Sequence, residues 1–181
     1  MKTKLPLYLA LLLLTQCSKC KKDDPAPVDQ LPPATQSGAN TFGCLVNGQP
    51  YTPQGRVGLG SNFDLSYDPG FNGGALIVRT YMAKTINDRK YLSVLGMHIA
   101  RTGSYPFSSA NEANAFYSDL FVPLPCDDYD SREPGTFSQG NLTVTRLDLA
   151  AGIVAGTFSF KLYHPGCDTL RVTQGRFDGK L

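Results

Sequence analysis

The sequence predicts an all-β fold, an antiparallel β-sandwich or a small β-barrel, behind a signal peptide and a disordered tether. From residue 41 onward, apolar and polar residues alternate with the two-residue period of strands. Turn residues recur roughly every ten positions, and no segment has the apolar spacing of a long amphipathic helix. These observations are typical of antiparallel all-β domains, and they leave sandwich and barrel as alternatives.

Residues 1–16 have the layout of a lipoprotein signal peptide. Two lysines precede an apolar stretch over residues 5–14, which is too short to cross a membrane because a span needs about 20 apolar residues. The motif LTQC at residues 14–17 follows. It resembles the lipobox of bacterial lipoproteins, in which the peptidase cuts before a cysteine whose thiol carries a diacylglycerol. We therefore expect lipidation, with palmitate among the acyl chains, at Cys17.

Cys20 is the alternative lipidation site. The residue before a lipidated cysteine is usually small, and Gln16 is larger than usual, but Cys20 follows a charged lysine and lies further from the apolar stretch. The two cysteines also match a Cys-x-x-Cys metal or redox motif. A four-coordinate zinc site would need a second pair of ligands, which the sequence does not supply.

Because two or more acyl chains anchor a protein stably, we expect a membrane anchor through the N-terminal lipid.

Residues 17–40 predict a lipidated, proline-rich, disordered tether ahead of an all-β domain over residues 41–181. The segment contains four prolines, several small polar residues and almost no large apolar ones. Such a composition cannot bury enough apolar surface to fold, and proline favours extended geometry.

Within the domain, strands are expected wherever the alternation is clear. The first of them places Phe42, Cys44 and Val46 on one face, and Asn47-Gly48 then predicts a type I′ hairpin turn. The later expected strands cover residues 74–83 and 91–100, which should pair as a hairpin, and residues 141–149, 153–162 and 169–181.

Three segments carry more specific expectations. Pro106 cannot donate to a strand ladder, so residues 102–107 predict a turn into a short edge strand. Residues 110–117 fit either one helical turn or the start of a strand, and we expect a short helix or turn that leads into a strand over 115–122, followed by a loop. Gly175 predicts a bulge that returns the next phenylalanine to the core.

Four stretches of the chain resemble a family of uncharacterised lipoproteins from Bacteroidetes. They are TFGCLVNGQPYTP, TGSYPF, LTVTRLDLAAGIVAGTFSF and VTQGRFDGKL. The resemblance covers most of residues 11–181. It implies an all-β domain without a known activity, anchored to the outer membrane in the cell envelope and facing the periplasm or the cell surface. An acidic patch after the lipidated cysteine, here Asp23-Asp24, is associated with surface export in that phylum.

The three cysteines of the domain predict one buried thiol and one disulfide. Cys44 lies on an apolar strand face, where a cysteine acts as a small hydrophobic residue. Cys126 and Cys167 lie in polar, proline-containing loops. In an oxidising compartment such a pair predicts a disulfide.

One loop is a candidate metal site. Asp127, Asp128, Asp130 and Glu133 lie within seven consecutive residues, and Ca²⁺ takes about 6–8 oxygen ligands. Their spacing matches no EF-hand, so a solvated acidic loop is the other interpretation, and we expect no bound metal.

Catalytic patterns are not apparent. His98 is expected inside a strand and His164 in a turn, and neither Ser61 nor Ser138 lies in a Gly-x-Ser-x-Gly motif.

The chain without its signal peptide is nearly neutral. Of the 17 basic residues two belong to the signal peptide, which leaves 15 against 15 acidic ones. A nearly neutral chain does not predict nucleic-acid binding. We expect no cofactor and no enzyme activity.

The function expected from these features is a non-enzymatic binding or structural module of the cell envelope. The alternative is a glycan-binding accessory or a hydrolase that acts on envelope or extracellular polymers, and the partner would be a glycan or an envelope protein. Aromatic side chains on β-sandwiches can bind sugars, although at least half must line the core of a domain that has no tryptophan. The aromatic candidates are Tyr51, Tyr67, Phe71, Tyr81, Tyr105, Phe107, Phe116 and Tyr117.

Overall fold

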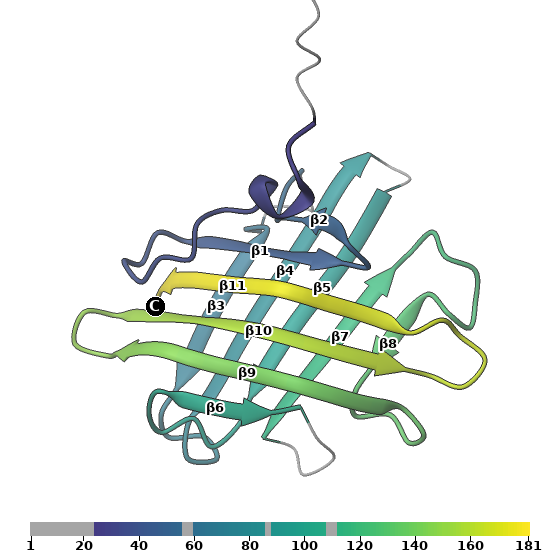
Figure 1. Ribbon diagram of the computed structural model, residues 1–181. Coiled ribbons are helices and arrows are strands. Elements are labelled where there is room, and N and C mark those ends of the chain that lie inside the picture. Colours follow the sequence, from purple (N-terminus) through teal and green to yellow (C-terminus); the bar gives the residue numbers. More distant parts are fainter. Residues whose placement is uncertain (1–23, 56–59, 86–87, 108–111) are drawn as a thin grey trace, which may run out of the picture.

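The fold consists of two antiparallel sheets packed face to face. The structure is a computed structural model that describes residues 24–55, 60–85, 88–107 and 112–181. Its strands are not closed into a barrel, so the sandwich is the correct one of the two predicted closures. In Figure 1 the strands of one sheet run across the front, and those of the other sheet cross behind them.

We call the six-stranded layer sheet A and the five-stranded layer sheet B. Sheet A has the order β2-β1-β11-β10-β9-β6, and sheet B has the order β3-β4-β5-β7-β8. The strands of sheet A are β1 (Thr41–Val46), β2 (Gln49–Tyr51), β6 (Gly103–Pro106), β9 (Phe137–Asp148), β10 (Ile153–Tyr163) and β11 (Leu170–Lys180). Those of sheet B are β3 (Phe63–Asp68), β4 (Ala75–Thr85), β5 (Asp88–Gly96), β7 (Ala113–Asp119) and β8 (Asp128–Asp130).

The core lies between the two sheets and is formed by alternate residues of each strand. Along β10, Phe158, Phe160 and Leu162 are buried and the residues between them are exposed, as the alternation predicts. One polar contact crosses the core from sheet to sheet. The Tyr51 hydroxyl of β2 lies 3.1 Å from the Thr80 hydroxyl of β4, which donates to the Leu92 carbonyl at 2.8 Å. Because a buried hydroxyl is costly unless hydrogen-bonded, this contact fixes the relative position of the sheets.

Several local predictions are confirmed. Asn47 and Gly48 both have positive φ values, 48° and 81°, as a type I′ turn between β1 and β2 requires. β4 and β5 pair as a hairpin, and β6 lies at the edge of sheet A. The register between β10 and β11 shifts next to Gly175, where Gln174 has a φ of 55° and Phe177 is buried beyond it.

The strand predicted over residues 115–122 is present as β7, but the short helix or turn predicted ahead of it is wrong from Ala113 onward. Residues from Ala113 onward form β7, which pairs with β5 on one side and β8 on the other, and residues 110 and 111 lie outside the described part of the chain. β7 is buried on both faces at Ala113, Asn114 and Ala115. A strand covered on both faces shows no alternation, so its period could not be recognised.

The strand predicted over residues 91–100 also ends early. β5 stops at Gly96, and His98 has a φ of 58°, in the left-handed region that a strand does not use. His98 therefore lies in an exposed turn rather than inside a strand.

The chain packs against the domain before residue 41, contrary to the predicted boundary of the tether. A 3₁₀ turn, η1 (Pro27–Gln30), lies beside β1 and β2, and Leu31 is buried. The following residues run over the outward face of sheet A. A Cβ on Gly43 would lie 2.6 Å from Pro32, so the glycine allows this close approach. Further along, Arg146 of β9 donates to the Gln36 carbonyl.

Asp178 of β11 holds this N-terminal segment in place. Asp178 is buried, and its carboxylate accepts hydrogen bonds from the Thr35 hydroxyl at 2.7 Å, the Ser37 N–H at 2.8 Å and the Gly38 N–H at 2.7 Å. Burial opposes the charged form, but these hydrogen bonds outweigh it and hold the pKa of Asp178 below its usual range. We call residues 31–40 and this carboxylate the N-terminal clasp.

Candidate functional site

The predicted lipidation sites cannot be compared with the structure, because Cys17 and Cys20 lie outside the described residues. The predicted disulfide is confirmed. The sulfur atoms of Cys126 and Cys167 are 1.99 Å apart, and the bond joins the loop between β7 and β8 of sheet B to the loop between β10 and β11 of sheet A. Cys44 is buried and free, and burial raises the pKa of its thiol.

The structure does not gather the acidic loop into a metal site. Asp130 is bound by the guanidinium of Arg132, with Nη2 to Oδ2 at 2.6 Å and Nε to Oδ1 at 2.9 Å. These hydrogen bonds hold the pKa of Asp130 below its usual range. Within the described ranges no three acidic, histidine or cysteine side chains are arranged to hold a metal ion, and this includes Asp127, Asp128 and Glu133.

The histidine and serine candidates have separate local roles. His164 follows β10, and its Nδ1 lies 3.5 Å from the Thr136 hydroxyl. The Ser61 hydroxyl donates to the Phe63 carbonyl at 2.7 Å, and Ser138 lies in β9. No contact between described residues joins either serine to a histidine.

Most of the aromatic candidates belong to the core. Tyr51, Phe107 and Tyr117 are buried, and Tyr67 and Tyr105 pack against the core from its margin. Phe71 is exposed in the loop before β4. Tyr81 and Phe116 differ from these, because they point outward from sheet B.

We define the aromatic face as the outward side of β4, β5 and β7, centred on Tyr81, Tyr91 and Phe116. Tyr81 pairs directly with Tyr91 across β4 and β5, and their ring centroids are 4.8 Å apart. Phe116 lies opposite Ser93, diagonal to Tyr91, with a ring separation of 5.5 Å. All three rings are half-buried, and neighbouring rings are tilted by 52° and 56°. They therefore form a continuous aromatic row across three strands.

Two adjoining hollows lie along this row. One, of about 330 Å³, lies between the row and the polar end of β7, and the other, of about 350 Å³, extends toward Leu120. Tyr91 and Phe116 line both of them. Small-molecule sites run from about 300 to 1,000 Å³, so each hollow has room for one small ring.

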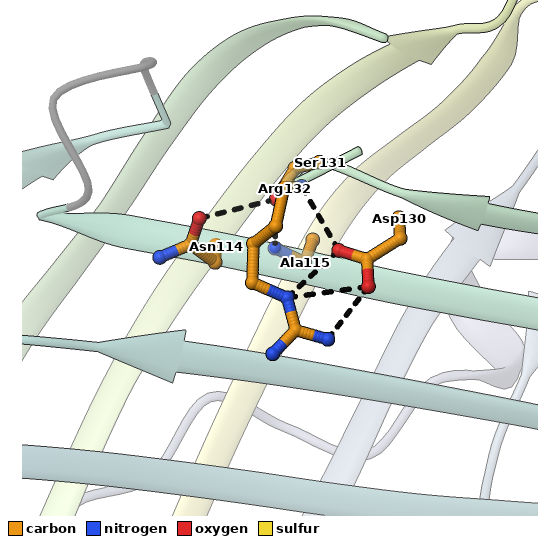
Figure 2. A network of polar contacts seen from close by, with 5 residues as sticks. All are labelled: Asn114, Ala115, Asp130, Ser131 and Arg132. Carbon is orange, nitrogen blue, oxygen red and sulfur yellow. Dashed lines mark hydrogen bonds and ion pairs between the residues drawn. The ribbon is translucent and has the colours of Figure 1, made fainter. Parts of the chain in front are cut away.

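A polar network borders the first hollow (Figure 2). The Ala115 N–H donates to the Ser131 hydroxyl at 2.9 Å, and that hydroxyl donates to the Asn114 side-chain oxygen at 3.4 Å. The Asn114 amide nitrogen points away from Ser131 in Figure 2 and makes no hydrogen bond to a described residue. Arg132 extends its guanidinium over β7, held by Asp130. The network therefore presents N–H donors in fixed positions beside the aromatic row.

The ion pairs around the aromatic face leave it close to neutral. Arg79 lies 3.4 Å from Asp64, in an exposed pair across β3 and β4. Lys90 lies 2.7 Å from Asp88 and also contacts Asp119. Arg132 pairs with Asp130. Arg89, which lines the second hollow, makes no ion pair with a described residue, so four cations face four carboxylates around the row.

The sequence interpretation missed Tyr91, Asn114 and Arg132. Tyr91 could have been found by listing the outward residues of the predicted 74–83 and 91–100 hairpin, because Tyr81 and Tyr91 then occupy the same face. Asn114 and Arg132 could not have been found in this way. Asn114 lies in β7, where the sequence predicted a helix or turn, and Arg132 lies in the turn after β8.

No known family model, curated protein or solved structure matches the chain. The resemblance to Bacteroidetes lipoproteins therefore stays a prediction. Among the described residues, no helix is long and apolar enough to span a membrane.

Proposed function

We propose that this protein is a lipid-anchored component of the bacterial cell envelope whose sandwich domain is a non-enzymatic binding module. The aromatic face is its binding surface. The observation that carries the proposal is the row of Tyr81, Tyr91 and Phe116, three half-buried rings on the outward side of a sheet whose inward side already supplies the core.

The outward position of these rings argues for binding. Contiguous apolar surface on a soluble domain commonly marks an interaction site. Aromatic side chains supply contact area at a low cost in side-chain entropy, because they have only two rotatable bonds. Here cross-strand pairing and the Ser131 network also hold the surroundings in place before any partner arrives. Such preorganisation lowers the free-energy cost of binding.

The anchor is proposed from the sequence. The signal-like residues 1–16 and the lipobox-like LTQC motif support lipidation at Cys17, and the resemblance supports the outer membrane as the destination. A Cys17→Ala variant should stay unprocessed and lose palmitate labelling. The matched Cys20→Ala variant should still be processed and labelled. The reverse result would move the anchor to Cys20, and labelling of both variants would contradict a single lipid anchor.

Binding can be followed with one introduced fluorophore, because the chain contains no tryptophan. Phe116→Trp places the sole indole on the aromatic face, and Tyr163→Trp places it on exposed β10 of sheet A as a matched control. The purified full chain is titrated with three envelope fractions: polysaccharide, peptidoglycan fragments and proteins. We expect a saturable emission change from Phe116→Trp with at least one fraction and none from the control. No change with any fraction, or equal changes in both reporters, would refute the binding face.

A further inference from the structure

We propose that the aromatic face binds an uncharged saccharide, with successive sugar rings in the two hollows on either side of Tyr91 and Phe116. This inference rests on the proposed function and adds the chemical class of the ligand. It follows from the shape of the face, its mixture of apolar and polar groups, and its charge.

The shape favours a short chain of rings over a single compact ligand. The hollows of about 330 and 350 Å³ are adjacent and share the Tyr91 and Phe116 rings as their common wall. Because the rings are tilted rather than coplanar, each wall presents a ring surface to the hollow beside it. A ligand built from repeated rings of similar size can place one unit in each hollow.

The chemistry of the first hollow matches a ring that is apolar on its faces and polar at its edge. Tyr91, Phe116 and Leu95 supply apolar surface, while Ser93, Asn114 and Arg132 supply hydrogen-bonding groups at the margin. A pyranose ring has this distribution, since its axial C–H groups form an apolar face and its hydroxyl groups project from the edge. A purely apolar ligand would cover the Asn114 amide nitrogen and remove it from water without giving it a hydrogen-bond partner, which is costly.

The charge distribution favours a neutral saccharide over an anionic one. Arg132 is already bound by both oxygens of Asp130, and Lys90 contacts two carboxylates. Arg89 in the second hollow makes no ion pair with a described residue, so the cations and carboxylates along the face balance in number. In the first hollow an anionic sugar would have to compete with Asp130 for Arg132 and would meet the negative charge of that carboxylate. An uncharged sugar can instead accept from guanidinium N–H groups and donate to carboxylate oxygens while the ion pairs remain intact.

The same fluorescent reporter tests the ligand class directly. Full-length Phe116→Trp is titrated with an array of neutral saccharides from one to six sugar units, and separately with a polyanionic polysaccharide. Tyr81→Trp serves as a second reporter should the first substitution perturb the fold. We expect a saturable shift with neutral oligosaccharides that is stronger for two or more units than for one, and none with the polyanion. Tyr163→Trp should stay unchanged throughout.

Two variants of the Phe116→Trp chain show which contacts carry the binding. Tyr91→Ala should weaken saccharide binding at least tenfold, and Asn114→Ala should weaken it by a smaller factor. Ser159→Ala, on the outward face of sheet A, should leave it unchanged.

The outcomes separate the ligand class from the binding face. If no neutral saccharide shifts the emission of either reporter while the envelope protein fraction or the polyanion does, the saccharide assignment is overturned and the binding face stands. If no probe acts on either reporter, both are overturned. A saccharide response that survives Tyr91→Ala at full affinity would also overturn the assignment, because binding would then lie elsewhere.

Discussion

The outward faces of the two sheets differ more than their inward faces do. Along β10 in sheet A, the outward residues are Thr157, Ser159 and Lys161, whereas the corresponding positions of β4 and β5 in sheet B include Tyr81 and Tyr91. Sheet A has an outward hollow of about 560 Å³, larger than either hollow of sheet B, and threonine, serine, asparagine and glutamine dominate its lining. The difference therefore lies in chemistry rather than in size.

This comparison separates what folding requires from what it does not. Both sheets bury apolar residues inward, and that burial supplies the core. Sheet A shows that polar residues on the outward side are compatible with the same fold, and its own N-terminal segment covers part of that side. The aromatic row of sheet B is thus not needed to complete the core, and this supports the proposal that it binds a partner.

The largest expected effect comes from removing the covalent link between the two sheets. The Cys126–Cys167 disulfide joins one loop of each sheet across a sequence separation of 41 residues. Replacing both cysteines with serine should lower the free energy of unfolding by about 4 kcal/mol, because the unfolded chain regains loop entropy. Urea unfolding monitored by circular dichroism measures this change.

Alkylation gives an independent control for the disulfide. In the denatured, unreduced chain, Cys44 should be alkylated, whereas Cys126 and Cys167 should remain unmodified, as read by peptide mass spectrometry. Modification of all three would contradict the disulfide.

Removing the charge that holds the N-terminal clasp should have the next largest effect. Asp178→Asn replaces one acceptor oxygen with an N–H donor that faces other donors, so we expect a loss of about 2–3 kcal/mol. Residues 24–40 should also be cleaved faster in limited proteolysis. Asp64→Asn is the matched control on sheet B, since its exposed ion pair with Arg79 contributes less than about 1 kcal/mol. Equal effects of the two variants would mean that the clasp adds no stability to sheet A.

The clasp should also respond to acid. The pKa of Asp178 is held below the ordinary value of 3.8, so its contribution is fully present above that value and is lost as the pH falls through the lower folded-state pKa. The difference in unfolding free energy between the natural chain and Asp178→Asn should therefore shrink as the solution is acidified below pH 3.8. Urea midpoints from pH 7 to pH 2 measure it. A difference that grows on acidification would contradict the assigned direction.

What the sequence predicted depended on local chemistry. Asn47-Gly48, Pro106 and the alternation around Phe158 each act through their own backbone or their nearest neighbours, and the structure confirms all three. The disulfide was predicted because both cysteines lie in polar loops and the compartment was expected to be oxidising.

The features that were missed depend on distant residues. Residues 31–40 have the composition of a disordered tether, yet they are held by Asp178, which is 140 residues from Gly38 in sequence. The aromatic row likewise depends on the register between β5 and β7, which sets Phe116 diagonal to Tyr91. Composition and alternation show which face of a strand is buried, but they do not show which distant strand or side chain it will meet.

The smallest expected effect decides whether the aromatic row is structural. Tyr91→Ala removes two ring contacts on the outward side of sheet B, and such cross-strand pairs contribute about 0.2–1 kcal/mol each. We expect the unfolding free energy to fall by about 1 kcal/mol, while Ser159→Ala on sheet A changes it by less than about 0.5 kcal/mol. Urea unfolding of the two variants measures both changes in unfolding free energy. A loss of about 3 kcal/mol or more at Tyr91 would be the cost of a core aromatic residue. The outward row would then belong to the fold, and the contrast between the two faces would no longer argue for binding.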